Sequence, residues 1–255
     1  MAKQPVLRDD LVAYLDRYLR VAEIPDASPN GLQVQGADRV RRIAYAVDAA
    51  VDTIAAAKKA RAGFLIVHHG LWWGRRERIV GTLHRRVSAL IETNVSLYCA
   101  HLPLDCHGEV GNNVELARLF GLKVTATFGD YKGVDIGVVA TAPRALKRAA
   151  FVGVIENALG VKADLLAFGP ATIKRVAIVS GGGAMFAEAA ARAGCDVLVT
   201  GESAHSAFHP AKEARVNLIF AGHYATETVG LKALDRHVQR RFGLPGVFIP
   251  APTGY

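Results

Sequence analysis

One pattern occurs twice in this 255-residue sequence, and it restricts the fold more than any other feature. In each copy, an apolar run typical of a buried strand is followed by a small residue, a histidine, three further residues and an acid. The first copy spans Ser96–Asp105 and the second spans Leu218–Glu227. Similar strand-like and helix-like segments precede both copies, so that each half of the chain has the order β-α-β-α-β-α. The sequence therefore predicts an α/β fold of two similar units that arose by internal duplication.

The predicted strands favour largely parallel sheets. The run Phe64–Val67 is apolar without alternation, as in a strand covered by helices on both faces, and a helix ended by Gly63 precedes it. Ligands of open α/β sheets collect at the carboxyl ends of the strands. We therefore expect a metal site in a cleft between the two units, where both sets of strand ends would face each other.

The same segments suggest domain boundaries. We predict a first α/β unit over residues 1–122 and a second over residues 175–255, whose C-terminal helix packs back on the first unit. The segment 123–174 contains short strand-like runs and one helix-like run but no candidate for chemistry. We interpret it as a connecting insertion.

Composition restricts the class of protein. Hydrophobic residues make up 51% and charged residues 21%, which is typical of a globular chain with a sizeable core. No apolar run reaches the roughly 18–20 residues of a membrane helix, and the polar N-terminal segment predicts no signal peptide. The three cysteines, Cys99, Cys106 and Cys195, lack CxxC spacing. Their odd number favours a reducing compartment, so we expect a cytoplasmic protein.

The chain is basic, with a net charge of +8. Such a charge allows phosphate-bearing partners, either nucleotides or nucleic acid. The basic residues are scattered in small clusters and form no stripe interleaved with aromatic residues. The charge pattern therefore leaves nucleic-acid binding open without favouring it.

Side chains suited to divalent metal ions gather at the predicted strand ends. His223 and Glu227 are four residues apart, so on a helix they share one face. His68 and His69 end a predicted strand, where neighbouring side chains point to opposite faces. The structural alternatives are a surface His/Glu pair and a histidine buried in a hydrogen bond. The full candidate set is His68, His69, His101, Asp105, His223 and Glu227.

Six candidates are too many for one four-coordinate ion and suit a dinuclear site. Imidazole and carboxylate without thiolate fit zinc, iron, manganese or nickel. Two such ions, about 3.5–4 Å apart, would activate a water for hydrolysis. We therefore predict two divalent metal ions per chain, of unspecified identity.

Other residues receive a structural interpretation. Gly181–Gly183 lacks the lysine and hydroxyl residue of a phosphate-binding loop, so a tight turn is favoured. Asn30 is interpreted as a turn residue, and Trp72 and Trp73 as core residues. Glu202 is a weaker candidate for a supporting role at the site.

Six motifs occur in order along nearly the whole chain: Ser28–Gly36, Val67–Gly70, Ala100–Asp105, Gly111–Asn113, Thr200–Glu202 and Ala221–Glu227. Together they resemble the GTP cyclohydrolase 1 type 2 homologue family, also called the NGG-one-interacting-factor-three-like proteins. The length is similar to that of the short bacterial form, which lacks an extra domain between the halves. The resemblance implies a two-part α/β protein that assembles into a toroidal homohexamer with dinuclear metal sites facing its interior.

The resemblance also implies roles for the candidate residues. His69 and Asp105 would hold one ion, His68 and His223 the other, and Glu227 would bridge them. His101 would lie close by, as a hydrogen-bonding partner or a catalytic proton carrier. The family name implies ring opening of GTP, in which an activated water attacks C8 of the guanine and formate leaves.

Three functions are therefore open, because a fold and a metal site do not establish a substrate. A metal-dependent hydrolase that acts on a nucleotide or a related small molecule is favoured. The second is a non-enzymatic metal-binding or adaptor protein, and the third is a basic ring that binds nucleic acid.

Overall fold

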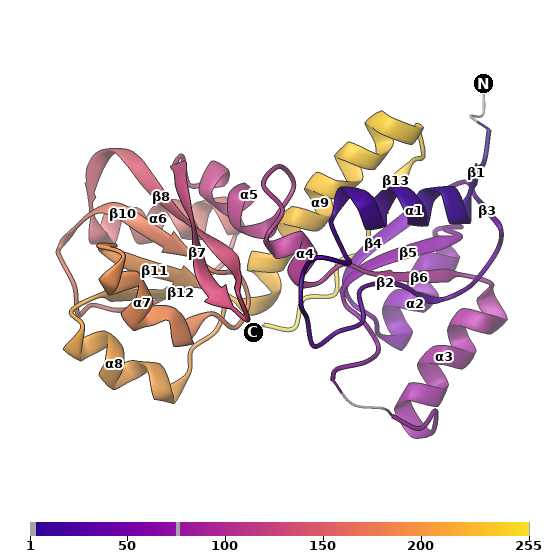
Figure 1. Ribbon diagram of the computed structural model, residues 1–255, viewed down its shortest axis with the longest axis horizontal. Helices are drawn as coiled ribbons and strands as arrows, with labels where there is room; N and C mark the ends of the chain where they lie inside the picture. The colour runs from indigo at the N-terminus through magenta and orange to yellow at the C-terminus, as the bar shows by residue number, and fades with distance from the viewer. Residues whose placement is uncertain (1–3, 75–76, 255) are drawn as a thin grey trace. The chain divides into compact units, whose positions relative to one another are not determined.

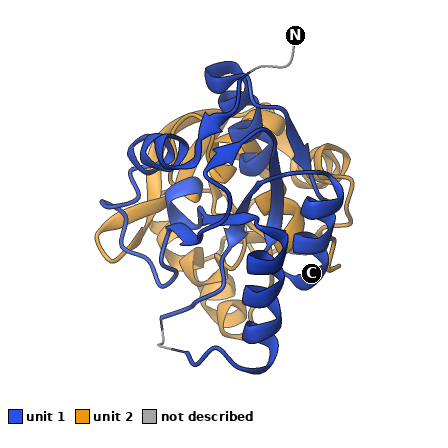
Figure 2. Cartoon of the chain, turned by 90° about the vertical axis from the view of Figure 1, so that its right-hand side faces the viewer, with its two compact units in different colours: residues 1–104, 230–251 blue, residues 105–229, 252–255 orange. Residues whose placement is uncertain are grey.

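Two units, each built around a mixed sheet, make up the chain in the computed structural model, which describes residues 4–74 and 77–254 (Figure 1). Unit 1 comprises Met1–Leu104 and Gly230–Ala251, and unit 2 comprises Asp105–Val229 and Pro252–Tyr255 (Figure 2). The α/β fold class expected from the sequence is confirmed. The domain boundaries expected at residues 122 and 175 stay predictions.

The sheet of unit 1 has five strands in the order β13-β4-β5-β6-β2. The strands β13, β4, β5 and β6 run parallel to one another, and β2 pairs antiparallel with β6. A separate antiparallel ladder joins β1 to β3. The strand bounds are Val6–Leu7 for β1, Gly31–Val34 for β2, Arg39–Val40 for β3, Ile43–Asp48 for β4, Phe64–His69 for β5, Ser96–Cys99 for β6 and Gly246–Phe248 for β13.

Helices cover both faces of this sheet, as its apolar runs require (Figure 1). The helices α2 (Val51–Lys59) and α3 (Gly81–Thr93) place Ile54 and Leu90 in one core with alternate residues of β4, β5 and β6. On the other face, the Tyr98 hydroxyl donates a 2.8 Å hydrogen bond to Asp16 of α1 (Arg8–Tyr18).

The sheet of unit 2 has six strands in the order β7-β8-β10-β11-β12-β9. Only β10, β11 and β12 run parallel to one another, whereas β7, β8 and β9 pair antiparallel. The strand bounds are Lys123–Tyr131 for β7, Val134–Lys147 for β8, Asp164–Leu166 for β9, Thr172–Ile178 for β10, Val197–Thr200 for β11 and Asn217–Phe220 for β12.

The prediction of largely parallel sheets is therefore wrong, and the segment 123–174 accounts for the difference. Lys132 and Gly133 both have positive φ, +54° and +87°, and close β7 and β8 into a hairpin. A two-residue connection can join only antiparallel strands. This segment, interpreted from the sequence as a connection, supplies three strands and a helix to unit 2.

Helices also cover both faces of the sheet of unit 2 (Figure 1). The fully buried Phe151 and Ile155 of α6 share one core with residues of α5 and with Val229 of α9. The helix α7 contacts β11, and α8 contacts β12. The helix bounds are Leu102–Asp105 for α4, Asn112–Leu119 for α5, Arg148–Leu159 for α6, Ala187–Arg192 for α7, Phe208–Glu213 for α8 and His223–Phe242 for α9, with short 3-10 turns at Ala184–Phe186 (η1) and His205–Ala207 (η2).

Each unit thus contains three consecutive parallel strands, β4-β5-β6 in one and β10-β11-β12 in the other. In both, a histidine follows the third strand, His101 after β6 and His223 after β12. Duplication stays a prediction. In the described part of the chain, no helix is both long and apolar enough to cross a membrane, and this includes the 20-residue α9.

Candidate metal centre

Three histidines of unit 1 form a cluster at the carboxyl ends of adjacent strands. His68 and His69 end β5, and His101 follows β6, which is hydrogen-bonded to β5. One nitrogen from each ring lies within 4.8 Å of those of the other two. The ring centroids are 4.9 Å apart for His68 and His101, and 5.8 Å apart for His69 and His101. The two neighbouring histidines therefore share one site.

Each ring in this histidine cluster has its Nδ1 held by an oxygen acceptor. A carbonyl or an ionised carboxylate only accepts, so Nδ1 carries the hydrogen and Nε2 carries the lone pair. The acceptors are the Ala100 carbonyl for His68 at 2.9 Å, Asp48 for His69 at 2.8 Å and Asp26 for His101 at 3.0 Å. This is the arrangement in which an imidazole can bind a metal ion or accept a proton.

The carboxylate behind His101 is held in its ionised form. Burial by itself would raise the pKa of Asp26, but the hydrogen bond and charge of His101, with the Asn30 amide, outweigh it. They lower the pKa of Asp26 to about 2. Asp26 is therefore a permanent acceptor near neutral pH.

In unit 2, a histidine and a carboxylate meet on the first turn of α9. His223 Nε2 lies 3.0 Å from Glu227 Oε1, and Glu227 is 3% exposed. His223 Nδ1 donates a 2.9 Å hydrogen bond to Glu202 Oε2. The hydrogen bond that His223 donates to Glu227 raises the pKa of His223 to about 9, although burial acts in the opposite direction. The predicted pairing of His223 with Glu227 on one helix face is thus present.

A glycine makes room for this pair. Gly181 has φ +61°, and a Cβ added to it would lie 2.2 Å from Glu227 Oε1 and 3.1 Å from His223 Nε2. The turn is fixed from behind, because the Gly181 N–H donates to Thr226 Oγ1 and its carbonyl accepts from Gly201 N. The glycine run is therefore a turn, as interpreted from the sequence, and it also shapes the site.

Asp105, the remaining candidate, is held within unit 2. Its side chain is buried, and Oδ1 accepts hydrogen bonds of 2.8 Å from Asn112 Nδ2 and Ser180 Oγ. Asn112 opens α5 and Ser180 follows β10. Two elements thus fix the orientation of this carboxylate.

Sequence reasoning missed two of the supporting acceptors and underrated a third. Asp48 ends β4 and pairs in register with His69, so its place at a strand end was a usable signal. Asp26 lies in a loop 75 residues from His101 and had no local signal. Glu202, only a weak candidate in the sequence, is the partner of His223.

Two structural interpretations also need correction. Asn30 is more than a turn residue, because its Oδ1 accepts a 2.7 Å hydrogen bond from the His101 backbone N–H. Trp72 packs against the core of unit 1 as expected. Trp73 does not, because it is 39% exposed and its ring centroid lies 4.9 Å from that of His101.

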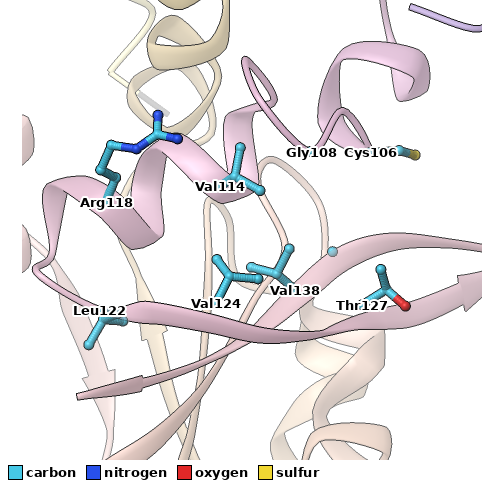
Figure 3. Close-up of a pocket in the computed structure, with 9 residues that line it drawn as sticks. Cys106, Gly108, Val114, Arg118, Leu122, Val124, Thr127 and Val138 are labelled. Atoms are coloured by element: carbon cyan, nitrogen blue, oxygen red, sulfur yellow. The ribbon is translucent and has the colours of Figure 1, made fainter. Parts of the chain in front are cut away.

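Unit 2 also has a mainly apolar depression of about 330 Å³ between α5 and the β7–β8 hairpin (Figure 3). Val114, Val124 and Val138 face into it, and Arg118, which forms an ion pair with Glu115, stands at its rim. None of the six candidate ligands lines this depression. It is therefore separate from the candidate metal centre.

Comparison with known proteins identifies the family. The model of the family described as Duf34/NIF3 (NGG1p interacting factor 3) matches residues 6–253. The chain belongs to the DUF34/NIF3 family. A Pyrococcus abyssi protein named GTP cyclohydrolase 1 type 2 homolog is 44% identical over 97% of this chain and 99% of its own length.

Two further proteins are similar to this chain over nearly its whole length. A Deinococcus radiodurans protein, also named GTP cyclohydrolase 1 type 2 homolog, is 45% identical over 97% of this chain and 94% of its own length. The crystal structure of TTHA1606 from Thermus thermophilus superposes with a TM-score of 0.90 at 43% identity, over 98% of this chain and 100% of that one. The resemblance stated from the motifs is confirmed.

Proposed function

We propose that this chain binds two divalent metal ions and is a metal-dependent hydrolase of a nucleotide or a related small molecule. His69 and Asp105 would hold one ion, His68 and His223 the other, and Glu227 would bridge them. The ligands would then come from both units, with the site in a cleft between them. The name that the relatives carry, GTP cyclohydrolase 1 type 2 homolog, makes GTP the first substrate to test.

One observation carries this proposal: His68, His69, His101 and His223 each have Nδ1 held by an oxygen. Metal-ligating histidines almost always have this partner, which fixes the ring and leaves Nε2 for the ion. A single histidine with a purely structural role could also make one such hydrogen bond. Packing alone does not explain why four histidines at the strand ends of one chain are all held in this way.

The chemical types of the proposed ligands also suit divalent metal ions. The donors are imidazole nitrogens and carboxylate oxygens, a set that suits zinc, iron, manganese or nickel. Gly181 leaves a space at the meeting point of Glu227 and His223 that a single Cβ would fill. That space lies where an ion bound by both side chains would need room.

Bound divalent ions would supply Lewis acidity and would make water a nucleophile near neutral pH. The side chains of the chain itself would do the rest. His101, with its lone pair on Nε2, can accept the proton that the water loses. The exposed ring of Trp73 beside it offers a flat surface on which an aromatic part of a substrate can stack.

The test is to measure metal content and GTP turnover on the same purified sample, for the native chain and for Glu227→Ala. Turnover is followed as released formate. About two metal ions per chain and formate release that is lost in Glu227→Ala would support a cyclohydrolase. Two ions without formate release would support the non-enzymatic metal-binding function or direct the search to other nucleotides. No metal in either sample after reconstitution would refute the metal centre.

A further inference from the structure

Resting on the proposed function, we infer that Asp26 and Asn30 are positioning residues that hold His101 in one orientation and one tautomer. His101 is the candidate proton acceptor of the site, so the nitrogen that carries its lone pair decides whether it can act. Both positioning residues lie in the loop before β2, and both act on His101 through hydrogen bonds.

The Asp26 carboxylate is buried and surrounded by donors. Its side chain is 3% exposed. Both oxygens lie 3.0 Å from His101 Nδ1. The other donors are the backbone N–H groups of Ala27 at 2.6 Å, Ser28 at 3.2 Å and Leu102 at 3.1 Å, and Asn30 Nδ2 at 2.8 Å. A carboxylate held by this many donors stays in place and accepts from the ring.

Asn30 holds the backbone at the same point. Its Oδ1 accepts a 2.7 Å hydrogen bond from the His101 N–H, while its Nδ2 donates to Asp26 and to the Ser28 carbonyl. The main chain and the side chain of His101 are thus fixed from one loop. Rotation of the ring would break the bond to Asp26, and a shift of the main chain would break the bond to Asn30.

The consequence is a defined tautomer. Because Asp26 accepts from Nδ1, the hydrogen stays on that nitrogen and Nε2 keeps its lone pair. The ring centroids of His68 and His69 lie 4.9 and 5.8 Å from that of His101. His101 therefore presents a basic nitrogen beside the proposed ligands without needing to be one of them.

A purely structural role is the alternative, since Asp26 also caps its own loop through Ala27 and Ser28. If this were the only role of Asp26, its substitution would lower stability and would not change the His101 tautomer in the folded chain. The two roles can be told apart by a measurement that reads the tautomer directly.

The experiment is nitrogen-15 NMR of histidine-labelled, metal-free protein, with His101 assigned by the loss of its signals in His101→Gln. We expect the Nδ1–H tautomer in the native chain. Asp26→Asn, whose amide can donate to Nδ1, should move His101 toward the Nε2–H tautomer. Asp48→Asn is the matched control, because it should change the signals of His69 and leave those of His101 in place.

An Nε2–H tautomer in the native chain would overturn the inference whether or not Asp26→Asn folds. An unchanged tautomer in folded Asp26→Asn would also overturn it. In metal-loaded protein, Asp26→Asn should keep the native metal content and lose roughly 10- to 100-fold in turnover. Because the tautomer is read without metal or substrate, absence of turnover in the native chain would refute the hydrolase and leave the tautomer result standing.

Discussion

At the residue scale, the candidate site depends on the absence of a side chain at one glycine as much as on the proposed ligands. Gly181 is the clearest case, because its φ of +61° and the nearby carboxylate both exclude a side chain. The first prediction is that Gly181→Ala loses metal affinity by at least tenfold, since its Cβ would lie 2.2 Å from Glu227 Oε1. Titration of the metal-free chain with zinc, followed by calorimetry, measures the change.

Gly182→Ala is the control for this substitution. Its Cβ would come no closer than 3.2 Å to Glu202 Oε1, and its φ is not positive. We expect its metal affinity to stay within about threefold of the native value. Equal losses in both variants would show that the turn, and not the space beside Glu227, controls binding.

The second prediction concerns pH and Asp26. Its pKa of about 2 in the folded chain lies below the unfolded value of about 3.9. Its contribution to folding, on the order of 2 kcal/mol, is therefore present above about pH 4 and is lost as the pH falls toward 2. Urea unfolding between pH 2.5 and 5 should show a smaller loss in Asp26→Asn than in the native chain. Parallel curves for the two would contradict this assignment.

At the element scale, buried polar side chains connect strands to loops. Asn217 opens β12 and is fully buried. Its Nδ2 donates to the carbonyls of Pro170 and Asp196, and its Oδ1 accepts from Gly169 N and Arg148. The loop before β10 is thus attached to the central strands of unit 2.

The third prediction is that Asn217→Ala lowers the free energy of unfolding by about 3 kcal/mol, because a fully buried side chain loses its four hydrogen bonds. Chemical denaturation measures the loss. Thr127→Ala, which removes only an exposed hydrogen bond to Asp135, should change it by less than about 0.5 kcal/mol. A loss in Asn217→Ala no larger than in this control would show that Asn217 does not hold the loop.

At the scale of the whole molecule, metal binding should stabilise the fold. An ion that binds only the folded chain adds about 2.7 kcal/mol when its concentration is a hundred times its Kd. The fourth prediction is a rise in Tm of the metal-free chain on addition of zinc or manganese, and its reversal by a chelator. Glu227→Ala should show little of this rise. An equal rise in that variant would place the stabilising ions elsewhere.

Assembly belongs to the same scale. The homohexamer implied by the family resemblance stays a prediction, as does its toroidal form. Light scattering coupled to size-exclusion chromatography should give six times the 27.2 kDa of the chain. A mass of one chain at micromolar concentration would contradict the hexamer.

Elements with strong local patterns could be predicted from the sequence. Apolar runs predicted the strands β4, β5, β6, β10, β11 and β12, and the spacing of His223 and Glu227 placed both on one helix face. These signals are local, because strand and helix periodicities are written in neighbouring residues. The residue types at the strand ends were enough to suggest a metal centre, although its ligand roles stay predictions.

How the candidate residues are held became visible only in the folded chain. The direction of β7 and β9 depends on pairing across the sheet, and the partner of His101 is a carboxylate 75 residues away. Hydrogen bonds over such separations leave no periodic trace in a sequence, because any loop can supply the acceptor once the chain is folded. For this reason the candidate histidines could be found in the sequence, whereas Asp26, which orients His101, could not.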